Sequence, residues 1–275
     1  MICDNVRCIL DQNKLYAKKM YGQNFLMDKN ILKRIIELSN VTKEDIIIEI
    51  GPGIGCLTEF LATASQKVIA YEIDEDMIRI LNKTLSPYSN VEIRHIDFLK
   101  ADLSEYLNVS NVKVVANLPY YITTPIITKL LSETNIENFL FMVQKEVGER
   151  ITGKPKTKDY NALSVLMNYK TNSKIVAHVN ANSFFPVPKV DSVLLLIEKK
   201  KIDCKPNNEA NFLKFVQNAF VQRRKTIVNN LISTYSIKRD EAEAVLKKNG
   251  LKTNCRSEEL DEYQLLNIYK ELFEK

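Results

Sequence analysis

Short apolar runs alternate with segments of helical spacing over the first two-thirds of this 275-residue chain. The runs are rich in Ile, Val and Phe and have the length of buried strands. Strands that alternate with helices predict a parallel sheet covered by helices on both faces. The predicted strands are Asp45–Ile50, Lys67–Ile73, Val91–Ile96, Val112–Ala116 and Asn138–Val143, with Lys174–Val179 and Ser192–Ile197 as extensions, and the predicted helices are Leu57–Ala64, Asp76–Leu85 and Ala162–Tyr169.

The last quarter of the chain has a different pattern. A charged run at Glu198–Lys201, followed by Lys205–Asn208, indicates a linker, and only helical spacing follows it. The predicted helices there are Phe212–Phe220, Thr226–Ser233, Arg239–Lys248 and Ser257–Phe273. We therefore predict an α/β fold with a Rossmann-like domain over residues 1–200 and a small all-α domain over residues 201–275.

A glycine-rich turn, Glu49-Ile50-Gly51-Pro52-Gly53-Ile54-Gly55, lies between a predicted strand and a predicted helix. Gly51 and Gly53 let the backbone approach a ligand closely and turn sharply into the helix. The spacing differs from the G-x-G-x-x-G pattern of dinucleotide-binding proteins and resembles the first motif of S-adenosylmethionine-dependent methyltransferases. S-adenosylmethionine is thus the favoured cofactor, and a nicotinamide dinucleotide is the alternative.

Two acidic residues follow later strands of the same predicted sheet. Glu72 lies 21 residues after Gly51, where a carboxylate can accept hydrogen bonds from both hydroxyls of a ribose. Asp97 ends the third predicted strand, within reach of the exocyclic amine of an adenine. Both residues are therefore predicted to bind the nucleoside part of the cofactor.

The fourth predicted strand leads into Asn117-Leu118-Pro119-Tyr120. This tetrapeptide resembles the motif of methyltransferases that act on planar amino nitrogens. The Asn117 side-chain oxygen and the Leu118 carbonyl can accept the two hydrogens of an adenine amine, and such preorganised groups stabilise charge that develops in the transition state. Pro119 would fix the loop and Tyr120 would stack on the base. The alternative is a turn that merely ends a strand.

A third stretch, Phe184-Phe185-Pro186-Val187-Pro188, precedes the last predicted strand. Prolines favour an extended loop here, and enzymes that modify a base hold it between apolar faces. Phe184, or its neighbour Phe185, is predicted to form one of those faces. The alternative is a hydrophobic loop buried against the sheet.

Together these motifs resemble the small-subunit ribosomal RNA adenine dimethyltransferases, the kasugamycin-sensitivity enzymes. The resemblance also includes Gly22–Leu26 and Gln222–Thr226, so that it covers nearly the whole chain. It implies dimethylation of two adjacent adenosines in a hairpin near the 3′ end of small-subunit RNA. It also implies cofactor contacts at Asn24, Leu26, Gly51, Glu72, Asp97 and Asn117. Some relatives have histidine at the position of Asn24.

Basic residues are unevenly distributed along the chain. Residues 199–275 hold 16 Lys and Arg against 11 Asp and Glu, so that the whole net charge of +5 lies in this part. Phosphate contacts position an RNA, and a basic appendage suits such a partner. The candidate RNA-binding residues are Lys18, Lys19, Lys154, Lys156, Arg223, Arg224 and Lys225. The alternative for each cluster is an ordinary solvated face.

Composition excludes several other classes of protein. No apolar stretch approaches the roughly 20 residues that cross a bilayer, and the five cysteines show no C-x-x-C spacing. We therefore expect a cytoplasmic protein without a metal site or membrane anchor. The resemblance implies a partner in small-subunit RNA within a pre-30S particle, and we expect a monomer.

Two alternatives remain for the function itself. Antibiotic-resistance methyltransferases that modify a large-subunit adenosine share the glycine turn and the Asn-x-Pro-Tyr motif, but Leu118, Asp191-Ser192 and Gln222–Thr226 favour the small-subunit enzyme. A non-catalytic ribosome-assembly factor on the same scaffold is the other alternative. The intact motifs around Gly51, Glu72 and Asn117 argue against lost catalysis.

Overall fold

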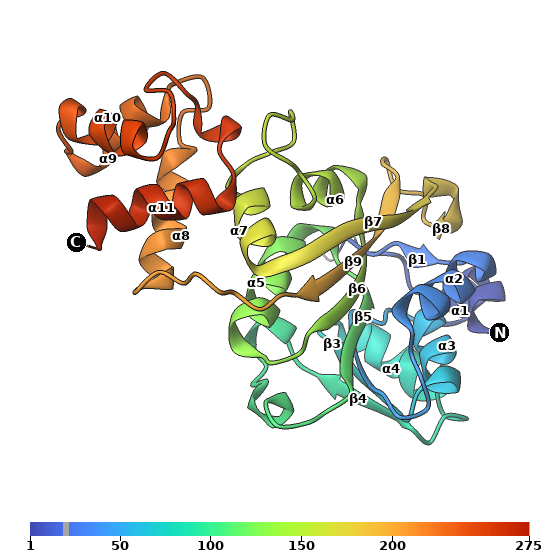
Figure 1. The fold of residues 1–275 in the computed structure, drawn as a ribbon. Helices are drawn as coiled ribbons and strands as arrows, with labels where there is room; N and C mark the ends of the chain where they lie inside the picture. Colours follow the sequence, from blue (N-terminus) through green and yellow to red (C-terminus); the bar gives the residue numbers. More distant parts are fainter. Residues whose placement is uncertain (19–21, 275) are drawn as a thin grey trace. The chain divides into compact units, whose positions relative to one another are not determined.

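The computed structural model describes residues 1–18 and 22–274. Two compact units are present (Figure 1). The sheet unit comprises residues 1–148 and 174–199, and the helical unit comprises residues 149–173 and 200–275. This division differs from the predicted boundary at residue 200, because residues 149–173 belong to the helical unit.

A seven-stranded sheet forms the centre of the sheet unit, in the order β4-β3-β2-β5-β6-β9-β7. All seven predicted strands are confirmed. Their bounds are β2 (Ile46–Ile50), β3 (Lys67–Glu72), β4 (Val91–His95), β5 (Val112–Asn117), β6 (Asn138–Gln144), β7 (Thr171–Val179) and β9 (Ser192–Lys199). A separate pair joins β1 (Phe25–Leu26) to β8 (Phe184–Phe185) in antiparallel register.

The sheet is mixed, whereas the sequence pattern predicted a parallel one. Strands β2 to β6 pair in parallel, but β9 runs antiparallel to β6. The register pairs Gln144 at the end of β6 with Ser192 at the start of β9. Strand β7 comes before β9 in the chain and lies at the edge of the sheet, so that β9 enters the sheet between β6 and β7.

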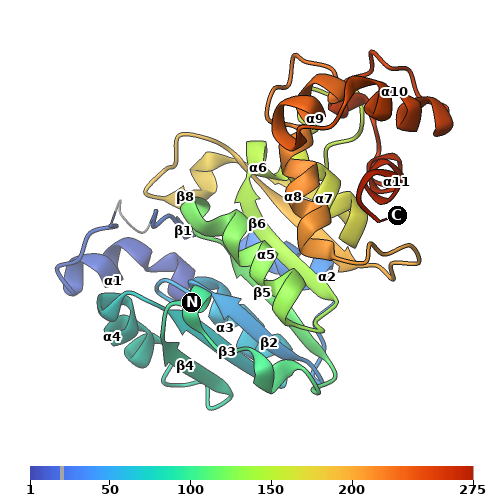
Figure 2. The same cartoon turned by 90° about the vertical axis from the view of Figure 1, so that its left-hand side faces the viewer.

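Helices cover both faces of this sheet. The helices of the sheet unit are α1 (Val6–Gln12), α2 (Lys29–Ser39), α3 (Cys56–Ala64), α4 (Glu75–Thr84), α5 (Thr123–Glu133) and α6 (Lys145–Ile151), which extends into the helical unit. Leu32, Leu57 and Met77 from α2, α3 and α4 share one buried core with Ile47 and Leu140 of the strands. Helix α5 lies in front of β5 and β6 in Figure 2, with α2 behind them.

The strand order places a ligand site at one edge of the sheet. From β2 the chain continues to β3 and β4 on one side, and β5 and β6 then lie on the other side. In open sheets of this kind, ligands bind beyond the carboxyl ends of the strands where the order reverses. That point lies between the carboxyl ends of β2 and β5, which are followed by the glycine turn and the Asn117 loop.

The helical unit has its own core. Its helices are α7 (Ala162–Lys170), α8 (Glu209–Ala219), α9 (Ile227–Tyr235), α10 (Arg239–Lys248) and α11 (Glu262–Phe273). Tyr160 and Tyr169 are fully buried among the rings and aliphatic side chains of these helices. The Tyr169 ring packs edge-on against Phe212 at 5.3 Å between centroids, and Tyr160 Oη donates to the Leu260 carbonyl at 2.8 Å. These contacts explain why residues 149–173 belong to the helical unit.

The predicted helix Ser257–Phe273 is divided in two. A 3₁₀ turn, η7 (Ser257–Glu259), comes first, and α11 begins after Asp261. The Asp261 carboxylate accepts the backbone N–H groups of Tyr263 and Gln264, while the Gln264 side chain accepts the Asp261 N–H. This reciprocal cap starts a new helix at residue 262. Within the described ranges, no helix has the length and apolar character that would let it cross a membrane.

Candidate active site

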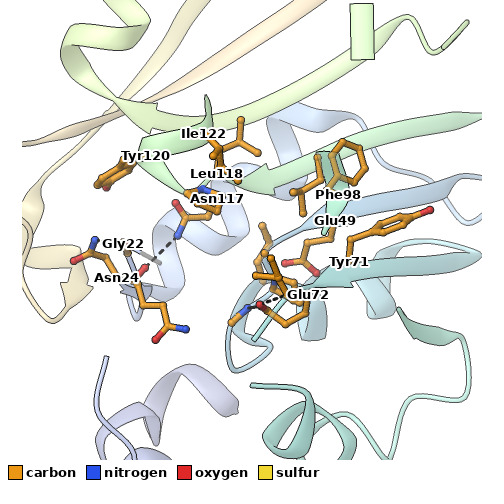
Figure 3. A pocket seen from close by; sticks show the side chains of 18 of the residues that line it. Gly22, Asn24, Glu49, Tyr71, Glu72, Phe98, Asn117, Leu118, Tyr120 and Ile122 are labelled. Atoms are coloured by element: carbon orange, nitrogen blue, oxygen red, sulfur yellow. Dashed lines mark hydrogen bonds between the residues drawn. The ribbon is translucent and has the colours of Figure 1, made fainter. Parts of the chain in front are cut away.

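A cavity of about 240 Å³ lies beyond the carboxyl ends of β2, β3 and β5. Five segments far apart in the sequence meet there: the stretch that contains β1, the glycine turn, the end of β3, the end of β4, and the Asn117 loop (Figure 3). The lining residues are 22–26, 49–54, 56, 57, 71–73, 96–99 and 117–122. Every residue that the sequence predicted to bind the cofactor lines this cavity.

The glycine turn is confined between two other lining segments. Gly51 and Gly53 have φ values of 70° and 60°, in the region that favours glycine. A Cβ atom at Gly53 would lie 3.0 Å from carbons of the Phe25 ring, and one at Gly51 would lie 3.3 Å from the Pro119 side chain. The turn therefore requires glycine for its conformation and for the close approach of its neighbours.

Glu72 is buried at the end of β3, with its carboxylate at the cavity. It accepts backbone N–H groups from Ile73 and Asp74 at 2.8 Å and from Gly53 at 3.3 Å. Burial raises the pKa of this carboxyl, and the three N–H groups oppose that rise. The backbone thus fixes the carboxylate, and its oxygens have further lone pairs that can accept hydroxyl hydrogens.

The ends of β3 and β4 provide an apolar slot with one carboxylate. Asp97 lines the cavity and accepts the Leu99 N–H at 3.0 Å. Ile73 and Ile96 are 42% and 40% exposed at the same wall, and Phe98 is buried below it. None of these three apolar residues was predicted from the sequence. Their signal is their place beside the acidic residues: Ile73 follows Glu72, and Ile96 and Phe98 flank Asp97.

The Asn117 loop forms the opposite wall. Asn117 Nδ2 donates to the backbone oxygen of Asn24 at 3.3 Å, which leaves Oδ1 as the acceptor end of the carboxamide (Figure 3). The Leu118 N–H donates to the Met142 carbonyl of β6 at 3.1 Å. Tyr120 is half-buried, and its hydroxyl lies 2.8 Å from Ser192 Oγ. All four residues of the predicted tetrapeptide line the cavity.

Phe184 was predicted to stack on the substrate base, but it lies away from the cavity. Its ring is fully buried in the core of the sheet unit, and it does not line the cavity. Strand β8 pairs with β1, so that Phe184 lies opposite Leu26 and contributes to the core of the sheet unit. A ring without exposed surface has no face for a base, so the structure does not support the predicted stacking role.

The remaining predicted contacts lie in the stretch that contains β1. Leu26 is buried with part of its surface at the cavity, and Asn24 is half-buried. The Asn24 side chain donates to the Gly22 carbonyl at 3.0 Å. Asn24 therefore contributes a backbone acceptor to Asn117 and holds its own loop.

Lys18 and Lys19, near the N-terminus, were predicted to bind RNA phosphates. Lys18 Nζ lies 2.7 Å from an Asp74 oxygen and 2.6 Å from an Asp76 oxygen, and these hydrogen bonds raise its pKa. Two carboxylates thus balance its charge inside the sheet unit. Lys19 lies outside the described residues.

The other predicted basic residues gather in the helical unit. Arg223 Nε pairs with Glu258 at 2.6 Å, and its guanidinium donates to the Lys158 carbonyl at 2.6 Å. The Lys156 N–H donates to the Glu258 carbonyl at 2.8 Å. Arg223 therefore fixes the loop that carries Lys154, Lys156 and Lys158 next to Arg224 and Lys225, all of which are exposed.

Glu49 also belongs to the site, although no role was predicted for it from the sequence. Its side chain is 1% exposed, lines the cavity, and has an oxygen, Oε2, without a hydrogen-bond partner. Burial raises the pKa of Glu49 to about 8. Burial therefore favours the neutral form of this carboxyl in the ligand-free protein. Its position two residues before Gly51, at the end of β2, is the sequence feature from which its place at the cavity could have been predicted.

Glu49 should make the stability of the ligand-free protein depend on pH. The folded state holds a proton that the unfolded state releases, so the free energy of unfolding should fall as pH rises from 4.5 to about 8. The slope reaches at most about 1.4 kcal/mol per pH unit. Urea unfolding of Glu49→Gln, which mimics the neutral acid, should show a smaller slope over this range. Parallel curves for the two proteins would assign the proton to another group.

Comparison with known proteins identifies the family. A family model described as "Ribosomal RNA adenine dimethylase" matches residues 14–274. The chain is 44% identical over 264 residues to the ribosomal RNA small subunit methyltransferase A of Geobacillus sp. (strain WCH70). This match covers 92% of this chain and 91% of that protein.

Two solved structures share the fold. A dimethyladenosine transferase from Plasmodium falciparum has a TM-score of 0.75 at 27% identity and covers 91% of this chain and 98% of that one. The 23S rRNA methyltransferase ErmE has a TM-score of 0.69 at 27% identity and covers 90% of this chain and 99% of that one. The family predicted from the motifs is thus confirmed, and this chain belongs to the ribosomal RNA adenine dimethylases.

Proposed function

We propose that this protein transfers methyl groups from S-adenosylmethionine to adenine amines of small-subunit ribosomal RNA. The observation that carries this proposal is the Asn117 carboxamide, which is held by the Asn24 carbonyl and faces the same cavity as the Glu72 carboxylate. One wall suits an amine substrate, and the other suits a nucleoside cofactor. The curated relative at 44% identity carries the name of a small-subunit enzyme, which supports that subunit as the target.

The lining residues fit S-adenosylmethionine. Glu72 would accept the ribose hydroxyls, Ile73 and Ile96 would contact the two faces of the adenine, and Asp97 would accept its amine. The partnerless oxygen of Glu49 suits the positive charge of this cofactor, because a buried carboxyl without a counter-ion favours a cationic ligand. When bound, S-adenosylmethionine supplies an electrophilic methyl group at its sulfonium.

The Asn117 loop provides the chemistry on the substrate side. The lone pair of an adenine amine is delocalised into the ring, so the amine is a poor nucleophile. Asn117 Oδ1 and the Leu118 carbonyl would accept its two hydrogens and favour a pyramidal nitrogen. Tyr120 would hold the base through its ring, which the Ser192 hydroxyl fixes. The methylated nitrogen is acidic and loses its proton without a strong base.

The family resemblance supports a finer proposal for the target. We extend the function to two adjacent adenosines of the 3′-terminal hairpin, with two methyl groups on each amine, in a pre-30S particle. On this proposal the protein is a cytoplasmic monomer and takes part in small-subunit biogenesis. The main alternative is a target in large-subunit RNA, because ErmE, whose fold is also similar, is named a 23S rRNA methyltransferase.

The basic cluster of the helical unit would bind phosphates of the RNA. Arg224, Lys225, Lys154 and Lys156 are exposed there, and Arg223 holds their two segments together. Phosphate contacts release counter-ions, so each contact should appear in the salt dependence of binding. Lys18 is excluded from this cluster, because Asp74 and Asp76 pair with it.

Neutralising Arg224 and Lys225 together should weaken RNA binding and flatten its salt dependence. The slope of log affinity against log salt should fall by roughly 1–2, since each lost phosphate contact contributes about 0.7–0.9. Fluorescence anisotropy with a hairpin RNA over a salt series measures this slope. Lys247→Ala, at an exposed position of α10, is the matched control. An unchanged slope in the double variant would remove these two residues from the interface.

One experiment tests the function as a whole. The protein is incubated with labelled S-adenosylmethionine and with under-methylated small and large subunits in separate reactions. Nuclease mapping should place the label on two adjacent adenosines of the small-subunit RNA. Label in large-subunit RNA would favour the alternative target, and no label in either would favour a non-catalytic assembly factor.

A further inference from the structure

Gln23 lies at the centre of a polar network that the function described so far does not use. Its Oε1 accepts the Lys18 backbone N–H at 2.8 Å, and its Nε2 donates to Asp74 Oδ2 at 2.8 Å. The other Asp74 oxygen accepts Lys18 Nζ at 2.7 Å and the Asp76 N–H at 3.0 Å. Asp74 is 2% exposed, whereas the side chains of Lys18 and Gln23 are only partly buried. Buried polar groups of this kind fix one geometry when all are paired.

The network joins two sides of the cavity. Asp74 follows Glu72 closely, and its N–H donates to the Glu72 carboxylate at 2.8 Å. On the other side, Gln23 precedes Asn24, whose backbone oxygen accepts Asn117 Nδ2 at 3.3 Å (Figure 3). Gln23 therefore ties the backbone around Asn24, and with it the Asn117 side chain, to the end of β3.

The orientation of the Asn117 carboxamide depends on this link. A carboxamide presents an acceptor oxygen on one side and a donor NH₂ on the other. While Nδ2 is bound to the Asn24 carbonyl, Oδ1 is the group left for a ligand. If that carbonyl shifts, a half-turn of the carboxamide would present NH₂ to the substrate amine, and donor would face donor.

We infer that Gln23, held by Asp74, is a positioning residue for methyl transfer: it fixes the Asn24 carbonyl that keeps Asn117 Oδ1 directed at the substrate amine. This role rests on the proposed transfer to an adenine amine. It also assigns a purpose to the Lys18 ion pairs, which support Asp74. A misplacement of about 1 Å at a reacting group can lower a rate about 100-fold, so the effect of losing the link is measurable.

Gln23→Glu breaks the link, because it places a carboxylate against the Asp74 carboxylate. The single-turnover rate at saturating cofactor and RNA should fall about 10- to 100-fold. Cofactor affinity by calorimetry and RNA affinity by anisotropy should stay within about threefold, since the bridge acts on geometry. Gln66→Glu is the matched control, because it makes the same charge change at an exposed position before β3. A normal rate in folded Gln23→Glu would overturn the inference, and so would a defect confined to cofactor affinity.

Exchanging the two partners should restore the rate. Gln23→Glu combined with Asp74→Asn keeps the total charge and reverses the direction of the hydrogen bond, since the asparagine amide can donate to the new carboxylate. The Lys18 N–H retains its acceptor, and the Asp76 N–H retains an oxygen. The double variant should recover to within about threefold of the original rate. Failure to recover, with the fold intact, would count against the bridge.

A cycle with Asn117→Ala separates positioning from a merely structural role. Without the carboxamide there is nothing to orient, so Gln23→Glu should cost less than about twofold in the Asn117→Ala background. Equal losses in both backgrounds would overturn the inference.

The Asn117 side-chain NH₂ signals in NMR give a readout that needs no activity. They should move in Gln23→Glu and return in the exchanged pair. If these signals move as expected but the original protein transfers no methyl group, the result would count against the proposed function and not against the bridge.

Discussion

Replacing Asn117 with Ala is expected to lower the rate of methyl transfer far more than it lowers RNA affinity. On the proposed mechanism the amine lone pair must leave conjugation as the methyl group arrives, and the Asn117 oxygen, held by the Asn24 carbonyl, would be the acceptor for that step. Loss of one such group typically costs about 100- to 1,000-fold in rate, or ~2.7–4 kcal/mol. RNA affinity depends mainly on phosphate contacts and should scarcely change.

The measurement is a single-turnover rate at saturating S-adenosylmethionine, because Asn117 also lines the cofactor cavity. Asn117→Asp keeps an acceptor and should retain more activity than the Ala variant. Asn182→Ala, at an exposed position of the 3₁₀ turn η6 (Ala181–Ser183), is the matched control. A near-normal rate in Asn117→Ala would show that this side chain does not act on the amine.

Replacing Glu72 with Ala is expected to weaken cofactor binding by tenfold or more. Two hydrogen bonds from ribose hydroxyls to a carboxylate contribute roughly 1.5–3 kcal/mol each, and both would be lost. The variant also leaves the N–H groups of Ile73, Asp74 and Gly53 without their acceptor, so the shape of the cavity is less well fixed. Both effects act in the same direction.

Calorimetric titration with S-adenosylmethionine measures this loss, and thermal unfolding of the ligand-free variant controls for the fold. Glu75→Ala is the matched control, since Glu75 is an exposed carboxylate at the start of α4. Unchanged cofactor affinity in a folded Glu72→Ala protein would remove Glu72 from the site. Equal weakening in Glu75→Ala would point to a general effect of charge.

Most of the cavity was predictable from the sequence because strand ends are local features. Gly51, Glu72, Asp97 and Asn117 each follow or end a short apolar run, and the carboxyl ends of parallel strands meet at one edge of a sheet. The order of apolar runs and helical segments therefore predicted that these four distant residues would line one cavity. The glycine turn lies between β2 and α3, as its place between a predicted strand and a predicted helix indicated.

The structure differs from the sequence-based expectations in features that depend on pairing between distant segments. Phe184 is buried because β8 pairs with β1, and no local pattern specifies that partner. Lys18 has the appearance of a phosphate-binding residue until Asp74 and Asp76 are placed beside it. Tyr160 and Tyr169 lie in the core of the helical unit, and the sequence does not state which of the two cores they join.

The passage of the chain between the two units affects how a newly made molecule folds. Strand β6 ends at Gln144, but its second neighbour, β9, is complete only at Lys199. At roughly 5–20 residues per second, synthesis leaves that edge of β6 unpaired for roughly 3–10 s. Tyr160 and Tyr169 stay exposed for longer, because Tyr269 on α11 is part of the core that buries them. A nascent chain that stalls before Lys199 thus presents an open strand edge, the kind of surface that chaperones bind and that promotes aggregation.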